Sequence, residues 1–499
     1  MAAEHIVALD AGTSGARCIV ARPGTGIVAV ARRGWCYQTP PDAGPFARSF
    51  DPEVFWATLC DVTSRGLADA GLSGSDIAAI GVTSQRLAVL VLDANGRSLY
   101  AGPNTDARAV AEGFAIDARI AERIYASTGK LPSLLLAPAR LQWLHKHGTA
   151  AFDNAASVLT LGDWVAYKLT GEIASERSLA ADCGLLDATN RERDAALLQK
   201  LDVPEALMPR LVSPTEVVGV ITQRAADDTG LAPGTPVTIA GGDSQCALVG
   251  MGVEQPGEMG IAAGWSCPVQ QVTAGPRFDV ERRTWVDLHV LPDRWVVESS
   301  AADAGSMWHW WCETLLGRSD DDTLAEAASL VGQAPPGSGD VLALLGMGVM
   351  NAKAMGLHLG GVLMNTPLAV GTVGRAELLR AALENVAFTQ RGNIEQAEEV
   401  SGQRAVRIAV GGGMTRTAAF PRILADVLGR PIEVAEQVDV TGLGAAILAA
   451  RAVGLPEDAL RATVRRIEPD PAHNDTYARS YERWRHLGKR LDDTMGELP

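Results

Sequence analysis

The sequence predicts an α/β protein of two domains with a duplicated core, and three observations support this prediction. A chain of 499 residues is too long for one hydrophobic core and suits two domains of about 200 to 250 residues each. Strand and helix patterns alternate along the first half. A pattern of strand, glycine turn and strand at the N-terminus recurs from Met259. We therefore expect one domain over 1–246, a second over 247–499, and a central cleft between the two lobes.

The first half opens with a predicted meander of three short apolar runs, separated by the glycine-rich turns DAGTSG and RPGTG. Helical and strand-like patterns then alternate, and a hairpin turn is predicted at Asn95-Gly96. A mostly helical stretch reaches about residue 200. The strands predicted in this half are 5–10, 16–21, 27–32, 77–82 and 236–241, and the first predicted helix is 51–70.

The second half repeats the meander in EMGIAAGWSCPVQQVT. We expect little helix in the acidic stretch near 318–340, which contains proline and glycine. Near the end of the chain, Tyr477, Tyr481 and Trp484 fall on one face of a helix, which we expect to pack on one domain. The other elements predicted here are helices 303–316, 374–400 and 418–428 and a strand 406–410.

Composition and charge narrow the class of protein. With 44 basic and 59 acidic residues the net charge is −15, and the two signs are interspersed, which argues against nucleic acid or an anionic membrane as a partner. No apolar run is long enough for a transmembrane helix, and the N-terminus lacks the features of an export signal. Seven scattered cysteines without a CxxC pair favour a reducing cytoplasm over a disulfide framework or a zinc site.

The segment LDAGTSGAR places an aspartate at the end of a strand and follows it with a tight turn. Its glycines, Gly12 and Gly15, let backbone amides face one point, where they can cradle a phosphate oxygen. The Thr13 and Ser14 hydroxyls and the Arg17 cation add donors. Asp10 can then hold Mg²⁺ through water. The alternative is an ordinary hairpin with a polar glycine turn.

The segment GGDSQCALVG ends an apolar strand on a carboxylate. One interpretation is structural, with Asp243 as the N-cap of a helix that starts at Ser244. The other is catalytic, because a carboxylate at the carboxyl end of a strand can take the proton from a hydroxyl that attacks a phosphoryl group.

Two glycine-rich segments lie near the C-terminal end. In AVGGGMTRT, residues Gly411, Gly412 and Gly413 follow a strand and offer a surface without side chains, on which a purine can lie. The alternative is a plain strand-to-helix turn. The helix predicted for TGLGAAILAA, 441–450, carries small residues that allow close approach either of a ligand or of another packed segment.

In combination these motifs resemble the FGGY family of carbohydrate kinases, from residue 5 to about 490. ALDAGTSGARCIV resembles the family's first phosphate motif, and IAGGDSQCALVGMG resembles the segment that holds its catalytic aspartate. LAPARLQWLHKH, with Arg140 where lysine is usual, and LGGVLMNTPLAVGTVGRAELLRAALENVAF resemble the two family signatures. LGDWVAYKLTGE and GGGMTRTAAFPRILADVLGRPI resemble further family segments.

The resemblance implies two actin-like, ribonuclease-H-like ATPase domains, with sugar mainly on the N-terminal domain and ATP mainly on the C-terminal one. It implies phosphorylation of a sugar or polyol hydroxyl, with Asp243 as general base and Mg²⁺ near Asp10 and Asp243. A homodimer stays open. The residues expected to contact ATP and its metal are Asp10, Gly12, Thr13, Ser14, Arg17, Gly264, Ser266, Gly411, Gly412, Gly413 and Arg416.

Substrate choice is expected to lie between residues 83 and 109. The pair that contacts sugar hydroxyls in related kinases maps onto Gln85 and Arg86, and the carboxylate that follows in the glycerol kinases is replaced by Leu87, which disfavours glycerol. The Gln-Met-His-Gly of xylulokinases is absent, and NTDARA and PVQQVT resemble the autoinducer-2 kinases. A ketopentose, polyol or hydroxyketone is expected, contacted by Gln85, Arg86, Asn104, Asp106, Asp243 and Gln245.

Two departures from the family pattern leave alternatives open. The second phosphate turn has Trp265 where threonine is usual, and GMGVMNAKAMG replaces a Gly-Glu-Arg. One alternative is therefore a sensor that binds sugar or nucleotide with little transfer, although retention of Asp10 and Asp243 argues against it. An actin-like assembly ATPase would share the fold, but it has no need for the Gln85-Arg86 pair.

Overall fold

The chain is described here from a computed structural model, which covers residues 3–147, 150–301, 303–318, 320–346, 348–354, 359–364 and 373–497. Parts of two sequence motifs, residues 347, 355–356 and 365–372, lie outside these ranges. Residue contacts divide the chain into two compact units. Within the described ranges no helix is long and apolar enough to cross a membrane.

The two units are discontinuous in sequence. Unit 1 consists of Met1–Glu254, Thr273–Val296 and Val440–Ala462, and unit 2 consists of Gln255–Val272, Val297–Asp439 and Thr463–Pro499. The single domain boundary predicted between residues 246 and 247 differs from this division, because two later segments return to unit 1. The predicted boundary concerns two continuous stretches of sequence, and it stays a prediction.

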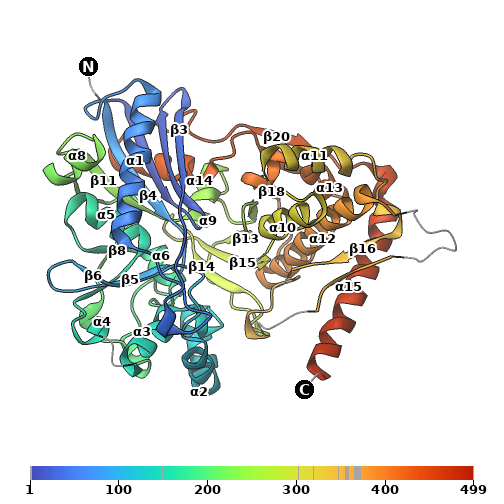
Figure 1. Cartoon of the computed structure of the whole chain (residues 1–499), viewed down its shortest axis with the longest axis horizontal. Helices are drawn as coiled ribbons and strands as arrows, with labels where there is room; N and C mark the ends of the chain where they lie inside the picture. The colour runs from blue at the N-terminus through green and yellow to red at the C-terminus, as the bar shows by residue number, and fades with distance from the viewer. Residues whose placement is uncertain are drawn as a thin grey trace. The chain divides into compact units, whose positions relative to one another are not determined.

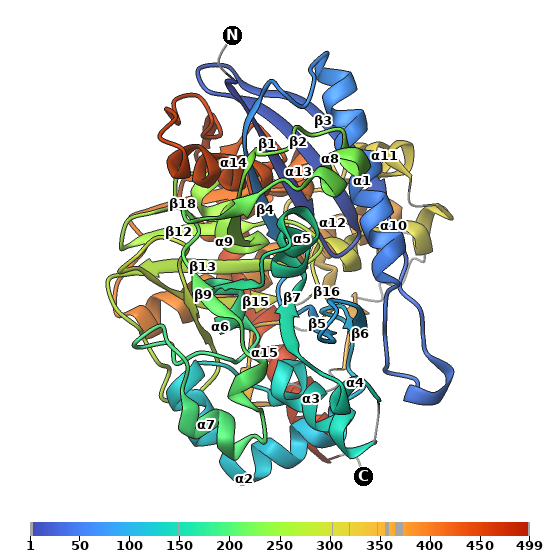
Figure 2. The same ribbon diagram turned by 90° about the vertical axis from the view of Figure 1, so that its left-hand side faces the viewer.

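Unit 1 is built on a six-stranded sheet of order β10-β11-β4-β1-β2-β3. β1 pairs antiparallel with β2 and parallel with β4, and β11 extends the parallel part. The predicted N-terminal meander is confirmed, and Figure 2 shows α1 (Pro52–Ala70) along β2 and β3. The strands are β1 His5–Ala11, β2 Gly15–Arg22, β3 Gly26–Gly34, β4 Ile77–Ser84, β10 Val217–Val220 and β11 Pro236–Gly242.

Unit 1 also contains the predicted hairpin, β5 and β6, which forms a three-stranded sheet with β7 and has Gly96 in its turn at a φ of +77°. The stretch up to residue 200 is mostly helical but also contains short strands. The elements are β5 Val89–Leu92, β6 Ser98–Gly102, α2 Val110–Thr128, α3 Ala137–Lys146, α4 Ala150–Asp153, β7 Ser157–Thr160, α5 Leu161–Thr170, β8 Ala174–Glu176, α6 Arg177–Asp182, α7 Ala195–Lys200, β9 Arg210–Val212, α8 Gln223–Thr229, α9 Asp243–Gly250 and β14 Trp285–Leu288.

The small-residue helix α14 (Val440–Ala452) completes the core of unit 1. It packs on α9 and on strands β1 and β4 (Figure 1). A Cβ added at Gly444 would lie 1.8 Å from the carbonyl oxygen of Cys246, and one at Gly442 would lie 2.5 Å from Cδ1 of Ile19. The glycines of TGLGAAILAA therefore let α14 pack closely on helix α9 and on strand β2, which is the packing alternative predicted from the sequence.

Unit 2 repeats this strand order, with β15-β13-β12-β18-β19-β20 corresponding to β3-β2-β1-β4-β11-β10. β12 pairs antiparallel with β13 and parallel with β18, as β1 does with β2 and β4. The duplicated core predicted from the two meanders is therefore confirmed. The strands are β12 Glu258–Ala262, β13 Cys267–Thr273, β15 Trp295–Ala301, β16 Leu342–Leu344, β17 Gly361–Leu363, β18 Arg407–Gly411, β19 Ile432–Ala435 and β20 Val464–Ile467.

Five α-helices of unit 2 lie within the described residues, and one of them, α11, contradicts the expectation of little helix near 318–340. The stretch 318–340 contains α11, whose N-cap Asp320 accepts a hydrogen bond from the backbone N–H of Thr323 at 2.8 Å. The acidic residues taken as a sign of a loop stand in its first turn, where the helix dipole favours them. The tail helix packs on the core through Tyr477, Tyr481 and Trp484, as predicted. The helices are α10 Gly305–Leu316, α11 Asp321–Val331, α12 Arg375–Ser401, α13 Ala419–Leu428 and α15 Asn474–Glu497.

Candidate functional site

The predicted catalytic and phosphate residues of unit 1 lie at one edge of its sheet. Strands β1, β4 and β11 run parallel, and in their register Asp10 and Gly241 both pair with Thr83, on opposite sides of β4. Neighbouring strands lie about 4.8 Å apart, so the backbones of Asp10 and Gly241 are about 10 Å apart. Asp243 follows two residues after Gly241. The edge thus brings together both carboxylates predicted from separate motifs.

The turn between β1 and β2 is closed by a hydrogen bond from the Gly12 N–H to the Gly15 carbonyl at 3.0 Å. Asp10 is buried, and Nη1 of Arg17 donates to its Oδ2 at 3.0 Å across the hairpin. Ser14 is exposed and Thr13 half-buried. The predicted phosphate turn therefore presents a hydroxyl to solvent next to a paired carboxylate.

Two predicted substrate residues are hydrogen-bonded to this turn. Nδ2 of Asn104 donates to Oγ1 of Thr13 at 2.8 Å, and the Asn104 N–H donates to Oε1 of Gln85 at 3.2 Å. Nε2 of Gln85 in turn donates to the Tyr37 hydroxyl at 3.0 Å, and that hydroxyl donates to the Thr13 carbonyl at 2.6 Å. Thr13, Gln85 and Asn104 thus belong to one hydrogen-bonded group. The sequence predicted that Thr13 contacts ATP and that Gln85 and Asn104 contact the sugar.

Asp106 has a different environment from the other predicted substrate residues. It is fully buried, and its carboxylate accepts hydrogen bonds from the Tyr100 hydroxyl at 2.5 Å, from Nε of Arg108 at 2.7 Å and from the Arg48 N–H at 2.8 Å. These donors occupy both oxygens. We therefore expect Asp106 to hold the segment of Asn104 in place, and its contact with substrate stays a prediction.

Asp243 is the first residue of α9, and Gly242 is the N-cap, so the N-cap alternative is not what the structure shows. Its Oδ1 accepts a hydrogen bond from the Ser244 N–H at 2.7 Å. Burial raises the pKa of the half-buried Asp243 carboxyl, and the positive charge of Arg86 opposes this shift. A raised pKa makes the carboxylate more basic, which suits proton abstraction.

Gln245 lies in the first turn of the same helix and is fully buried. Neither Oε1 nor Nε2 of its amide makes a hydrogen bond within the described part of the chain. A Cβ added at Gly242 would lie 2.6 Å from that Oε1 and 3.0 Å from Cγ of Arg86. Gly242 therefore leaves the space in which Gln245 and Arg86 approach Asp243, and a buried amide without partners is costly unless a ligand or water satisfies it.

In unit 2, the predicted nucleotide residues come from two adjacent turns. Gly411 ends β18 opposite Ala262, and the Met414 N–H donates to the Ala263 carbonyl at 2.9 Å. Gly412 has a φ of +120°, and a Cβ there would lie 2.7 Å from that carbonyl. Gly411 is buried, whereas Gly413 and Arg416 are exposed. Of the three glycines, Gly413 offers the open surface that the sequence analysis expected of all three.

The second turn follows β12 and contains Gly264, Trp265 and Ser266. The Gly264 N–H donates to the Ser266 carbonyl at 3.0 Å, and the Trp265 carbonyl accepts from the N–H groups of Ala304 and Ser306, each at 3.2 Å. The indole of Trp265 is 56% exposed, and its ring centroid lies 6.0 Å from that of His309. The turn is therefore fixed by backbone contacts with the start of α10, while its side chain is open to a ligand.

Several charged residues next to the unit 1 site were not among the residues predicted from the sequence. Lys130, Asp182 and Asp287 are fully buried, and the two carboxylates face Arg86. Arg140, noted only as a departure from a signature, is buried and donates to the Leu87 carbonyl at 2.6 Å. These residues belong to no common motif and come from distant segments. The weak signal available was the presence of single charges within apolar surroundings.

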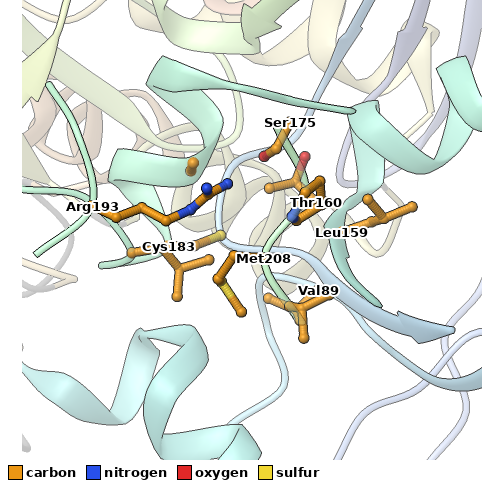
Figure 3. A pocket seen from close by; sticks show the side chains of 11 residues that line it. Val89, Leu159, Thr160, Ser175, Cys183, Arg193 and Met208 are labelled. Carbon is orange, nitrogen blue, oxygen red and sulfur yellow. The ribbon is translucent and has the colours of Figure 1, made fainter. Parts of the chain in front are cut away.

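Another pocket of unit 1 contains none of the predicted site residues. Figure 3 shows the Arg193 side chain reaching toward Thr160 and Ser175, with Cys183 and Met208 nearby. The rest of its lining is mainly apolar. The pocket therefore supports no role in the chemistry of the sheet edge.

The described residues contain no group of three or more histidine, cysteine, aspartate or glutamate side chains that could hold a metal ion. Mg²⁺ is usually held by one or two carboxylates together with phosphate oxygens and waters. The buried carboxylate of Asp10 next to the Thr13 turn fits such a shared site. The donor set therefore suits a magnesium ion that arrives with a nucleotide.

Comparisons with known proteins agree with this geometry. Residues 5–250 match the N-terminal domain, and residues 278–453 the C-terminal domain, of the FGGY family of carbohydrate kinases. The autoinducer-2 kinase of Enterobacter sp. (strain 638) is 30% identical over 503 residues, with 96% of this chain and 93% of that protein covered.

Solved structures show the same fold. The xylulose kinase of Rhodospirillum rubrum matches with a TM-score of 0.83 and 26% identity, covering 98% of this chain and 99% of that one. The gluconate kinase of Lactobacillus acidophilus matches with a TM-score of 0.86 and 19% identity, covering 99% of both chains, and this likeness concerns the fold alone.

Proposed function

Because the chain belongs to the FGGY family of carbohydrate kinases, and is thus a sugar kinase, we propose that it phosphorylates a ketopentose or a related polyol or hydroxyketone with ATP. One observation carries the proposal. Asp243 stands at the same sheet edge as Asp10 and the Thr13 turn, so a base and a phosphate site face one region. Such positioning supplies most of what phosphoryl transfer requires of a protein.

Asp243 acts as the general base in this proposal. Its carboxylate takes the proton of the substrate hydroxyl as that oxygen attacks the γ-phosphorus of ATP, and the bond to the bridging oxygen of ADP breaks. The positive charge of Arg86 favours the ionised form of this carboxyl and so opposes the rise in pKa that burial causes. Arg86 and Gln245 orient the hydroxyl, and both lie around Gly242 next to the base.

The nucleotide phosphates are assigned to the turn of Gly12, Thr13 and Ser14, and the adenosine to Gly413 and Arg416 in unit 2. Gly264 and Ser266 are assigned to the second phosphate turn. Asp10 and, on the reacting side, Asp243 would hold Mg²⁺ through water. When bound, the ion neutralises charge on the phosphate oxygens. Arg17 anchors Asp10, and the Thr13 hydroxyl is oriented by Asn104.

The substrate class follows from the residues after β4 and β6. Gln85, Arg86 and Asn104 supply amide and guanidinium groups that suit hydroxyl and carbonyl oxygens of an open-chain sugar. Leu87 supplies no carboxylate, which disfavours glycerol. The similarity to an autoinducer-2 kinase and to a xylulose kinase supports a five-carbon hydroxyketone or ketopentose. The seven cysteines form no disulfide, which supports the cytoplasm as the site of action.

A second candidate is a sensor that binds sugar or nucleotide with little transfer. It is favoured by Trp265, because an exposed indole replaces the hydroxyl expected in the second phosphate turn. Ser266 in the same turn still offers a hydroxyl. The presence of both Asp10 and Asp243 favours the kinase.

The test is a coupled ADP-release screen with MgATP and D-xylulose, L-ribulose, aldopentoses, pentitols, tetritols, glycerol and an open-chain dihydroxyketone. Wild type, Asp243→Asn and the control Asp76→Asn are compared. Asp76 lies just before β4, at the opposite edge of the same sheet, where it accepts from the Ser73 N–H at 2.8 Å.

We expect a ketopentose or hydroxyketone to stimulate ADP release at least tenfold, Asp243→Asn to reduce it about 100-fold or more, and Asp76→Asn to leave it unchanged. Nucleotide binding by Asp243→Asn, measured by calorimetry, should match wild type. Activity above about a tenth of wild type in Asp243→Asn would exclude the base role. ATP binding without stimulation by any compound would favour the sensor.

A further inference from the structure

Four charged side chains form a buried cluster at the Arg86 side of the unit 1 site. Nζ of Lys130 donates to Oδ1 of Asp182 at 2.9 Å and also to Oδ1 of Asp287. The side chains of all three residues are 0% exposed. Lys130 follows α2, Asp182 ends α6 and Asp287 lies in β14, so three distant segments of unit 1 converge on one point.

The second oxygen of each carboxylate faces Arg86. Oδ2 of Asp182 lies 3.9 Å from Nε of Arg86, and Oδ2 of Asp287 lies 3.8 Å from its Nη1. Both oxygens are buried and make no hydrogen bond within the described residues. The Trp285 ring lies on the same side, with its centroid 5.9 Å from Cζ of Arg86 and 4.6 Å from Nζ of Lys130. The two carboxylates are therefore shared between two cations.

The backbone next to Arg86 is also constrained. Leu87 has a φ of +65°, a left-handed conformation that is costly for a residue with a branched side chain. Its carbonyl accepts a hydrogen bond from Nη1 of the buried Arg140 at 2.6 Å. A strained backbone conformation persists only where the surrounding structure holds it in place. The hydrogen bond from Arg140 therefore holds Leu87 in this conformation and helps to fix the direction of the preceding side chain, Arg86.

The arrangement is poorly explained by stability alone. The charges of two cations and two carboxylates cancel, but removing four ions from water costs free energy. In many proteins, apolar side chains of the same volume would make the folded state at least as stable. What such a cluster supplies is a fixed direction for each charge. Without these charged neighbours, the long side chain of Arg86 could adopt several rotamers.

We propose that Asp182 and Asp287 are positioning residues, which with Lys130 between them fix the guanidinium of Arg86 next to Asp243 and so determine how the substrate hydroxyl is presented. The proposal rests on the proposed function, in which Arg86 contacts the substrate. Asp182 and Asp287 are too deeply buried to touch the sugar themselves. Their effect on the reaction therefore passes through Arg86.

A double-mutant cycle tests this path. Arg86→Ala, Asp182→Asn, Asp287→Asn and the combinations of Arg86→Ala with each Asn variant are assayed with the ketopentose D-xylulose and MgATP. We expect each Asn variant to raise the KM for sugar at least tenfold and the KM for ATP less than twofold. Combined with Arg86→Ala, neither should add a further increase beyond twofold, because both act through the same side chain.

Asp279→Asn is the matched control. Asp279 lies in the same segment as Asp287, is buried, and pairs with Arg283 at 2.8 Å, so its loss tests stability without touching the cluster. It should lower the melting temperature and leave the KM for sugar unchanged. Asn variants that change the melting temperature but not the KM for sugar, or effects additive with Arg86→Ala, would overturn the proposal.

A crystallographic comparison needs no substrate. Wild type and an Asp182→Asn/Asp287→Asn variant are crystallised, and the variant should show Arg86 displaced or in several conformers. An unchanged Arg86 would also overturn the inference. The proposed function fails separately, when Arg86→Ala itself leaves the KM for sugar unchanged or when no compound of the substrate screen is phosphorylated.

Discussion

Nδ2 of Asn104 donates a hydrogen bond to Oγ1 of Thr13 over 2.8 Å. The contact joins the segment after β6 to the turn between β1 and β2, which are 91 residues apart in sequence. It leaves the Thr13 hydroxyl hydrogen available to another acceptor, since the oxygen accepts from the amide. A change at Asn104 therefore reaches both the proposed sugar contacts and the proposed phosphate turn.

Replacement of Asn104 by alanine should raise the KM for sugar and the KM for ATP together, each by about fivefold, which corresponds to about 1 kcal/mol for a lost hydrogen bond. Steady-state kinetics in both substrates measure this. Asn95→Ala, in the exposed β5–β6 turn, is the control and should change neither constant. A rise in the KM for sugar alone would show that the Thr13 contact has no part in ATP binding.

Replacement of Asp10 by asparagine should lower kcat about 100-fold and raise the Mg²⁺ concentration needed for half-maximal rate, because the carboxylate at the phosphate turn is lost. Arg17→Gln breaks the same 3.0 Å ion pair from the other side and keeps the carboxylate. It should leave the Mg²⁺ dependence near wild type. If both variants shift the Mg²⁺ titration equally, the ion pair and not metal binding explains the effect of Asp10.

Glu176 predicts a pH dependence of stability. Burial raises the pKa of its carboxyl from 4.5 to about 7 in the folded chain. Hydrogen bonds from Ser178 and Leu179 lower this pKa but do not cancel the effect of burial. At pH below about 4.5 both folded and unfolded forms are protonated and no cost arises. As the pH rises from about 4.5 to about 7 the unfolded chain ionises first, so the folded state loses about 3 kcal/mol of stability, and the loss stays constant above that range.

Glu176→Gln cannot ionise, so its stability relative to wild type should improve between pH 5 and pH 8. Urea denaturation at both pH values measures the difference, and Glu172→Gln, an exposed neighbour, should show no such trend. A difference that moves in the opposite direction would contradict a raised pKa for Glu176.

Gly444→Ala should destabilise the protein by about 1–3 kcal/mol or more, because the added Cβ would lie 1.8 Å from the Cys246 carbonyl oxygen. Thermal melting measures the loss. Because Cys246 lies in the helix that starts at Asp243, kcat should fall as well. Gly275→Ala, where a Cβ meets nothing within 4 Å, should melt like wild type. Equal melting temperatures for the two variants would contradict the packing of α14 on α9.

Much of the site could be predicted from sequence because its residues follow strands. Asp10 and Asp243 each stand at the end of an apolar run, and parallel strands bring their carboxyl ends to one edge. The repeated meander likewise predicted the duplicated sheet order, since local patterns determine strands and turns. The predicted phosphate and substrate residues also follow strands, and their roles stay predictions.

The buried charge cluster could not be predicted, because a single aspartate within an apolar segment, such as Asp182 or Asp287, is only a weak sign of burial. Their burial depends on β14 and α6 meeting the end of α2, which are contacts between distant segments. The helix α11 was missed for a local reason, since acidic residues at 320–322 indicate a helix start as readily as a loop. The return of α14 to unit 1 was equally invisible in its own sequence.

The late position of α14 has a consequence for synthesis on the ribosome. The strands and helices of unit 1 up to Glu254 are made long before Val440–Ala452, whose side chains fill the space against Ile6, Ile19 and Val249. At 5–20 residues per second the interval between residues 254 and 440 lasts roughly 10 to 40 s. During that time the nascent unit carries an uncovered apolar face, so its maturation depends on a helix that the ribosome makes after most of unit 2, Gln255–Val272 and Val297–Asp439.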